Sequence, residues 1–178
     1  MSSTAVFLDR DGVINPDVGH PHRVSDAVLF PDVGPALRRL QTAGHRLVIV
    51  SNQSGVGRGY FGLDQVVRFN TALMTALHQE GVAIDIEHFY VCPHTPADNC
   101  SCRKPKPGLL VAAATALDLR FTDSFIVGDA GSDMEAGRAV GLTTIFLNRD
   151  READTPQADW VHDNLSDVAD LVLRQSRA

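Results

Sequence analysis

Two aspartates and a glycine follow the first apolar run of the chain, in the segment AVFLDRDGVIN at 5–15. Alternate side chains of an extended strand point the same way, so Asp9 and Asp11 can face one small volume where the strand opens into a loop. Two carboxylates held this close repel each other unless a cation lies between them, and hard cations such as Mg²⁺ take oxygen ligands. The spacing therefore favours a magnesium-dependent catalytic site over a polar turn, which needs only one Asp and a Gly.

Further polar residues follow other apolar runs. HRLVIV is followed by Ser51 and the glycine-rich loop SNQSGVGRGYF, and FIVGDAGSD places Asp129 and Asp133 after a later run. Because Asp133 comes one helical turn after Asp129, it could orient that residue, reach a metal through water, or cap a helix. The chain thus offers several polar groups at the ends of its predicted strands.

All three cysteines lie in one segment, VCPHTPADNCSCRKPK at 91–106, where a histidine completes the spacing C-x-H-x5-C-x-C. Three thiolates and one imidazole form a ligand set of tetrahedral structural zinc and leave no open position for water. Disulfides are the competing interpretation, but an odd number of cysteines without a recognisable secretion signal favours a reducing compartment. We expect a zinc-binding loop at 92–106 that fixes Arg103 and Lys104 near the strand ends. Its ligands would be Cys92, His94, Cys100 and Cys102.

Short β-rich runs alternate with helical patterns along the chain. We expect strands at 5–8, 46–50, 87–91, 124–127, 143–147 and 159–161, and helices at 32–43, 63–79, 107–117, 132–140 and 165–174. The second of these helices carries apolar residues at helical spacing, and Asp32 would cap the first. Repeated strand and helix predict an α/β fold, a doubly wound, mostly parallel Rossmann-like sheet with helices on both faces. Ligands of such sheets bind beyond the carboxyl ends of the strands, where Asp9, Ser51 and Asp129 fall.

The size and charge of the chain suit one catalytic domain. A chain of 178 residues buries about 70% of its unfolded surface, enough for a sheet covered on both faces. Its 16 Lys and Arg against 22 Asp and Glu give a formal net charge of −6, which disfavours non-specific nucleic-acid binding. No apolar segment approaches 20 residues, so we expect neither a signal peptide nor a membrane span. We expect a single cytoplasmic domain over 1–178, monomeric and without nucleic-acid or membrane partners.

The ordered set DxD, Ser, Lys and GDxxxD resembles the haloacid dehalogenase superfamily of phosphohydrolases, from residue 7 to about residue 141. The resemblance implies that Asp9 attacks phosphorus and forms an aspartyl phosphate. Asp11 would protonate the leaving oxygen and later deprotonate the attacking water. Mg²⁺ would be held by Asp9, the Asp11 backbone carbonyl and Asp129. The other phosphate oxygens would be held by the Ser51 hydroxyl, the Asn52 amide and the Lys104 ammonium.

Members of this superfamily with large substrates insert a cap domain after the first or second motif. Here both intervals are filled by ordinary strand and helix patterns, and 11–51 is too short to hold a folded cap as well. We therefore expect no separate cap domain. The open site would be rimmed by residues 17–22, by residues 53–61 and by the zinc-binding loop.

Within the superfamily, FLDRDGVIN, SNQSGVGRGYF, CPH, CSCRKPKPG and VGD are similar to the D-glycero-D-manno-heptose 1,7-bisphosphate 7-phosphatases. That resemblance implies removal of the C7 phosphate from a heptose bisphosphate, a small sugar phosphate. Arg103 would meet the more distant polar or phosphate groups of the substrate. The sugar would be lined by Asp17, Gly19, His20, Gln53 and Ser54.

Two departures from that family keep another substrate in view. Ala130 stands where the family often has a lysine, and the short HTPADNC segment is similar to the histidinol-phosphate phosphatase domain of histidine biosynthesis. Histidinol phosphate is therefore the alternative substrate. A hypothesis of another class is a non-catalytic, zinc-stapled binding module, but such a module does not need Asp11 beside Asp9, or Ser51 and Lys104 at matching positions.

Overall fold

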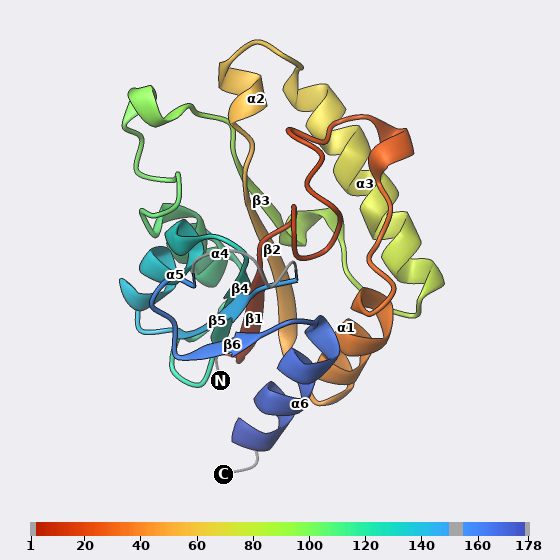
Figure 1. Ribbon diagram of the computed structural model, residues 1–178, viewed down its shortest axis with the longest axis vertical. Coiled ribbons are helices and arrows are strands. Elements are labelled where there is room, and N and C mark those ends of the chain that lie inside the picture. Colours follow the sequence, from red (N-terminus) through yellow and green to blue (C-terminus); the bar gives the residue numbers. More distant parts are fainter. Residues whose placement is uncertain (1–2, 150–154, 177–178) are drawn as a thin grey trace.

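The computed structural model describes residues 3–149 and 155–176 (Figure 1). In this part of the chain, six strands form one sheet in the order β3-β2-β1-β4-β5-β6, and every neighbouring pair is parallel. The strands are β1 (Ala5–Leu8), β2 (Arg46–Asn52), β3 (Phe89–Cys92), β4 (Phe125–Gly128), β5 (Thr143–Leu147) and β6 (Trp160–His162). The strand order reverses between β1 and β4, and the crevice beyond that point is where parallel α/β sheets bind ligands.

Helices cover both faces of the sheet, as the alternating pattern predicted (Figure 1). One face is covered by α1 (Val33–Thr42), α3 (Leu63–Gln79) and α6 (Leu165–Gln175), and the other by α4 (Gly108–Ala116) and α5 (Gly131–Arg138). A single helical turn, α2 (Ser54–Gly57), follows β2, and three 3₁₀ turns complete the set: η1 (Val24–Asp26), η2 (Ile86–His88) and η3 (Pro96–Asp98). The sheet is therefore doubly wound.

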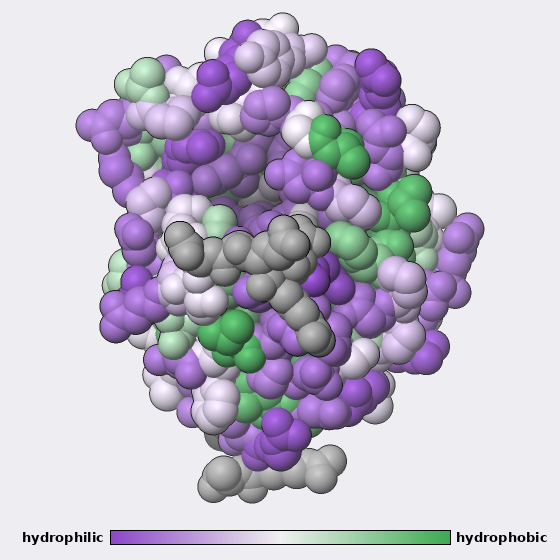
Figure 2. Space-filling view, viewed as in Figure 1, coloured by the Kyte–Doolittle hydropathy of each residue, from purple (hydrophilic) through white to green (hydrophobic). Residues whose placement is uncertain are grey.

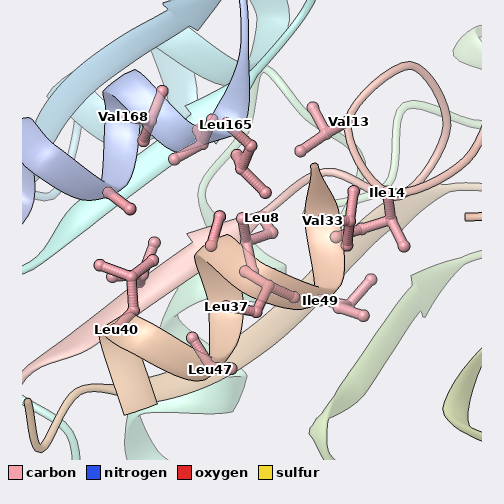
Figure 3. Close-up of a cluster of buried hydrophobic side chains, with 14 of the residues drawn as sticks. Leu8, Val13, Ile14, Val33, Leu37, Leu40, Leu47, Ile49, Leu165 and Val168 are labelled. Atoms are coloured by element: carbon pink, nitrogen blue, oxygen red, sulfur yellow. The ribbon is translucent and has the colours of Figure 1, made fainter. Parts of the chain in front are cut away.

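The central strand sends apolar side chains into both layers, because a parallel sheet is buried on both faces. Val6 and Leu8 pack in the cluster beneath α1, α3 and α6, whereas Ala5 and Phe7 pack on the opposite side. Figure 3 shows Leu8 of β1 and Leu37 of α1 meeting within the first cluster. The next turn of chain joins it as well: Val13 and Ile14 have 0% exposed surface. The loop that carries Asp9 and Asp11 is thus anchored in the core at both of its ends.

Several element boundaries differ from those expected. β2 continues to Asn52, and β3 begins at Phe89 because η2 occupies the preceding residues. Asp32 was expected to cap α1, but its backbone is already helical and its side chain makes no hydrogen bond to that helix. The Asp32 carboxylate instead accepts a hydrogen bond from the Leu165 amide, 2.6 Å away, at the first residue of α6. This Asp therefore caps a helix 133 residues later in the chain.

In the described part of the chain no helix combines the length and apolar character that a membrane span requires. The face seen in Figure 2 is mostly hydrophilic, and its apolar side chains form separate groups. This distribution is expected when helices cover both apolar faces of the sheet.

Candidate active site

A cleft of about 310 Å³ opens beyond the carboxyl ends of β1, β2 and β4. It brings together most of the residues that the sequence predicts for the site, from segments far apart in the chain. Its lining is Asp9, Asp11, Asp17, Gly19, His20, Ser51, Asn52, Ser54, Arg103, Lys104, Asp129, Ala130 and Ser132. Gln53, which was also expected there, is not among them.

Lys104 lies between two carboxylates at the floor of the cleft. Its Nζ is 2.9 Å from Asp9 Oδ1 and 2.5 Å from Asp133 Oδ1, and it also donates a hydrogen bond to the Val50 carbonyl at 2.8 Å. Burial disfavours the ammonium form, but the charges of Asp133 and Asp9 outweigh it and raise the pKa of Lys104. Lys104 is therefore a fixed cation directly beside Asp9.

The carboxylates around Lys104 carry more negative charge than one cation can balance. Burial raises the pKa of Asp9 to about 8; Lys104 opposes this rise, and Asp133, Asp129 and Asp11 add to it. Burial, together with Asp133, also raises the pKa of Asp129 to about 6. A further cation among these oxygens would relieve the repulsion and hold both groups ionised.

The donor set suits Mg²⁺. One carboxylate oxygen each from Asp9, Asp129 and Asp133 lie within 4.8 Å of one another, and oxygen atoms are the ligands this ion takes. Gly12 makes the arrangement possible, because its φ is +81° and a Cβ there would come 1.8 Å from Asp129 Oδ2. The loop after β1 can therefore pack directly against Asp129.

Asp133 caps a helix, which is one of the roles that its position allowed, and it also pairs with Lys104. Its Oδ2 accepts a hydrogen bond from the Ala130 amide at 3.2 Å, which caps α5, and its Oδ1 pairs with Lys104. It is fully buried, as is Lys104, so it orients the lysine as well as the helix. The sequence suggested the cap but gave no signal for the pairing with Lys104.

The Asp11 side chain turns toward Arg10, an arginine that no sequence motif indicated. Arg10 Nε donates to Asp11 Oδ1 at 2.8 Å and Arg10 Nη2 donates to Asp11 Oδ2 at 2.9 Å. Asn15 Nδ2 contacts the first oxygen at 3.0 Å, and Gln53 Nε2 contacts the second at 2.8 Å. With its side chain held in this way, Asp11 could offer a metal its backbone carbonyl, as the resemblance implies.

Gln53 and Asn52 hold other site residues in place. Gln53, expected to contact substrate, is 2% exposed and lies below the cleft, where its Nε2 also donates to Ser51 Oγ at 2.8 Å. The Asn52 side chain bonds the Lys104 backbone on both sides, accepting from its amide at 3.1 Å and donating to its carbonyl at 3.0 Å. The Asn52 side chain therefore positions Lys104, while its backbone amide could serve a phosphate oxygen.

The four expected zinc ligands lie together beside the cleft. Their sulfur atoms are 3.2–3.6 Å apart, and His94 Nδ1 is 3.5 Å from Cys92 Sγ and 3.4 Å from Cys102 Sγ. These sulfur separations are well above the S–S bond length of about 2.05 Å in a disulfide. They approach the roughly 3.8 Å that follows from Zn–S bonds of about 2.3 Å in a tetrahedron. Burial raises the pKa of the Cys92 thiol to about 12, so a cation is needed to keep it as a thiolate.

Ring contacts join the two loops on the rim of the cleft. The ring centroids of His20 and Tyr60 are 5.6 Å apart, and those of His22 and Phe61 are 4.4 Å apart in a stacked arrangement. On the opposite rim, Arg103 Nη1 donates to the His94 carbonyl at 3.3 Å, so the cysteine loop supports this side chain. Fixed loops thus form the rim on both sides.

Comparisons with known proteins identify relatives of this chain. Residues 101–168 match the model of the HAD-hydrolase-like family. A D-glycero-beta-D-manno-heptose-1,7-bisphosphate 7-phosphatase of Haemophilus ducreyi is 38% identical over 97% of this chain and 100% of that protein. The enzyme of the same name from Escherichia coli K12 is 36% identical over 99% of this chain and 97% of that protein.

A solved structure extends the similarity to three dimensions. The D,D-heptose 1,7-bisphosphate phosphatase of B. bronchiseptica, in complex with magnesium and phosphate, superposes with a TM-score of 0.86. It is 30% identical, over 97% of this chain and 99% of that one.

Proposed function

The chain belongs to the haloacid dehalogenase-like family of heptose bisphosphate phosphatases, and from that premise we propose that it removes the C7 phosphate of D-glycero-D-manno-heptose 1,7-bisphosphate. The protein is a phosphatase. The observation that carries the proposal is the cleft itself, where Asp9, Asp11 and Asp129 meet Lys104 and Arg103. Acidic groups for the chemistry and cations for phosphate thus lie within one small volume.

In the first step Asp9 is the nucleophile. One of its carboxylate oxygens attacks phosphorus, the bond from phosphorus to the sugar oxygen breaks, and the sugar oxygen takes a proton from Asp11. Lys104 stabilises the negative charge that spreads over the phosphoryl oxygens in the transition state. Asp9 and Asp129 would hold Mg²⁺, which would supply further positive charge beside the transferring group.

In the second step water releases the phosphate. The Asp11 carboxylate takes a proton from the water as its oxygen attacks phosphorus, and the bond to Asp9 breaks. The products are inorganic phosphate and a free Asp9 carboxylate, while Asp11 is protonated for the next cycle. Splitting one hydrolysis into two displacements lowers the barrier to each.

The second phosphate of the substrate would be met on the rim. Arg103 lines the cleft beside Lys104, and its guanidinium can bind a phosphate through two parallel hydrogen bonds. Lys104 is buried while Arg103 is half-buried, so the lysine serves the transferring group and the arginine the group left on the sugar. A substrate with two phosphates fits this pair of cations better than histidinol phosphate does.

We also propose that the cysteine loop holds one structural zinc. All four ligands are protein atoms, so the ion would fix the loop and take no part in hydrolysis. Its effect on the reaction is indirect, through the placement of Arg103 and Lys104. We further propose that the enzyme works as a monomer in the cytoplasm, which size-exclusion chromatography and cell fractionation can test.

Phosphate release from a small substrate panel tests the function. The purified protein with Mg²⁺ would be assayed on both anomers of the heptose 1,7-bisphosphate and on histidinol phosphate, with Asp9→Asn as the inactive control. We expect a heptose bisphosphate to be preferred at least tenfold in kcat/KM, and phosphorus NMR of its product to show a phosphate only at C1. A preference for histidinol phosphate, or a phosphate left at C7, would contradict the proposal.

A further inference from the structure

Arg10 is a fully buried arginine, with 0% exposed surface. Besides its two bonds to Asp11, its Nη1 donates to Asn70 Oδ1 at 3.0 Å and its Nη2 donates to the Pro21 carbonyl at 3.0 Å. Its guanidinium carbon lies 4.4 Å from the centre of the Phe69 ring. These contacts come from three segments: Asp11 from the loop after β1, Asn70 and Phe69 from helix α3, and Pro21 from the rim loop before η1.

A buried cation of this kind is costly unless its contacts are complete, because the charge has lost its water shell. Here the planar group has matched acceptors and an aromatic face, an arrangement that a lysine could not reproduce. Two nitrogen atoms of the guanidinium group bond the two oxygens of Asp11, and such a bidentate pair fixes the rotation of the carboxylate as well as its distance. Arg10 thus defines where the Asp11 oxygens point.

We propose that Arg10 is a positioning residue for proton transfer, which fixes the place and rotation of the Asp11 carboxylate at the edge of the cleft. This inference rests on the proposed role of Asp11. Arg10 does not line the cleft and meets no substrate, so it acts only through Asp11. Because it also holds the Pro21 carbonyl, Arg10 links the rim loop of Asp17, Gly19 and His20 to the residue that moves the proton.

A second arginine provides a matched control. Arg149 braces the same loop from its other side, where it donates to the carbonyls of Gly12 at 3.3 Å and Val13 at 3.1 Å. It also pairs with Asp32 and lies over the Phe30 ring, 4.0 Å from the ring centre. Arg149 therefore resembles Arg10 because it is an arginine that supports the loop after β1, but it makes no contact with Asp11 among those observed.

The test compares two substrates of nearly equal shape. p-Nitrophenyl phosphate has a leaving group that departs without a proton, whereas phenyl phosphate needs one, so only the second depends strongly on Asp11. The value of kcat/KM reports the step that expels this group. Asp11→Asn, Arg10→Met, Arg10→Lys and Arg149→Met would be measured on both substrates with saturating Mg²⁺, and folding checked by thermal denaturation.

We expect Arg10→Met and Arg10→Lys to lower kcat/KM for phenyl phosphate at least tenfold and for p-nitrophenyl phosphate less than threefold. Arg149→Met should lower kcat/KM for the two substrates by the same factor. In an Asp11→Asn background, Arg10→Met should add less than a threefold loss, because the group that it positions is gone. Should the Arg10 variants fail to fold, Asn70→Leu removes one anchor of Arg10 and should show a weaker loss with the same preference.

The outcomes separate this inference from the proposed function. If Asp11→Asn lowers kcat/KM equally for both substrates, Asp11 is not the general acid, and the part of the proposed function that depends on Asp11 is wrong. A second result is that Asp11→Asn leaves kcat/KM for p-nitrophenyl phosphate nearly unchanged while the Arg10 and Asn70 variants lower kcat/KM equally for both substrates. That result refutes the positioning role of Arg10. Full activity of Arg10→Lys would also refute it, because charge without the bidentate contact would then be sufficient.

Discussion

At the scale of single residues, Asp9 differs from an asparagine chiefly in its ability to attack phosphorus. Its Oδ1 accepts a hydrogen bond from the Arg10 amide at 2.7 Å and contacts Lys104, and an amide oxygen could do both. We predict that Asp9→Asn lowers kcat at least about 10³-fold, in line with the loss of a nucleophile, and leaves the unfolding temperature nearly unchanged. Phosphate release and thermal denaturation of one preparation measure both. Turnover near that of the wild type would place the nucleophile elsewhere.

The two cations of the cleft should affect different substrates. Lys104→Ala removes charge next to the transferring group, so kcat should fall roughly 10²- to 10³-fold for every phosphomonoester. Arg103→Ala should lower kcat/KM for a bisphosphate by a factor that corresponds to roughly 1.5–3 kcal/mol, the contribution of a charged hydrogen bond. It should hardly change kcat/KM for a monophosphate. Kinetics of both variants on the two substrates check this division. It is wrong if each variant affects both substrates equally.

The sequence predicted the residues that end strands better than those that support them. Asp9 and Asp129 could be placed at the cleft because strand ends in a parallel sheet share one edge. Arg10 was missed because its other side-chain partner, Asn70, lies 60 residues away on α3, and no local pattern joins them. A charged residue inside an otherwise buried segment was the available signal. Gln53 was misplaced because its side chain turns down to Ser51 and Asp11 instead of toward the cleft.

At the scale of elements, most helices and strands follow from periodicity, whereas their caps depend on tertiary contacts. Asp32 has the residue type of a helix cap, but the amide that it binds belongs to α6 and not to α1. The turn α2 was not expected, because four residues are too few to show helical spacing. Local patterns thus identify an element more reliably than they identify the contacts at its ends.

The cysteine loop should act as one unit that the zinc holds in shape. We predict one tightly bound zinc per chain, retained after dialysis removes Mg²⁺, because thiolates favour zinc and carboxylates favour magnesium. Cys102→Ser should lower the zinc content and raise KM for the bisphosphate more than it lowers the unfolding temperature, since it loosens the support of Arg103. Metal analysis, kinetics and thermal denaturation measure these three quantities. Protein purified under reducing conditions without zinc would contradict the prediction.

At the scale of the whole molecule, the parallel sheet and the covering of both its faces followed from the alternation of strand and helix patterns. The contacts at the amino-terminal end of the strands could not be predicted in this way, because they are single polar contacts between distant segments. There, at the start of β2, His45 is buried between Thr4, 3.2 Å from its Nδ1, and Ser176, 2.9 Å from its Nε2. This histidine therefore connects β1, β2 and the end of α6.

His45 should make the stability of the fold depend on pH. Burial lowers its pKa below the ordinary histidine value of 6.5, so the unfolded chain binds a proton more readily than the folded protein does. The stability that a neutral His45 provides is therefore complete above pH 6.5 and is lost as the pH falls through the folded pKa.

His45→Gln keeps groups that can bond both hydroxyls but cannot titrate. We predict that the wild type loses stability relative to this variant below pH 6.5, by up to about 1.4 kcal/mol per pH unit for one proton. Urea unfolding of both proteins at pH 5, 6 and 8 isolates the effect, because the other titrating groups are common to them. If the difference in unfolding free energy stays constant over this range, His45 does not carry the linkage.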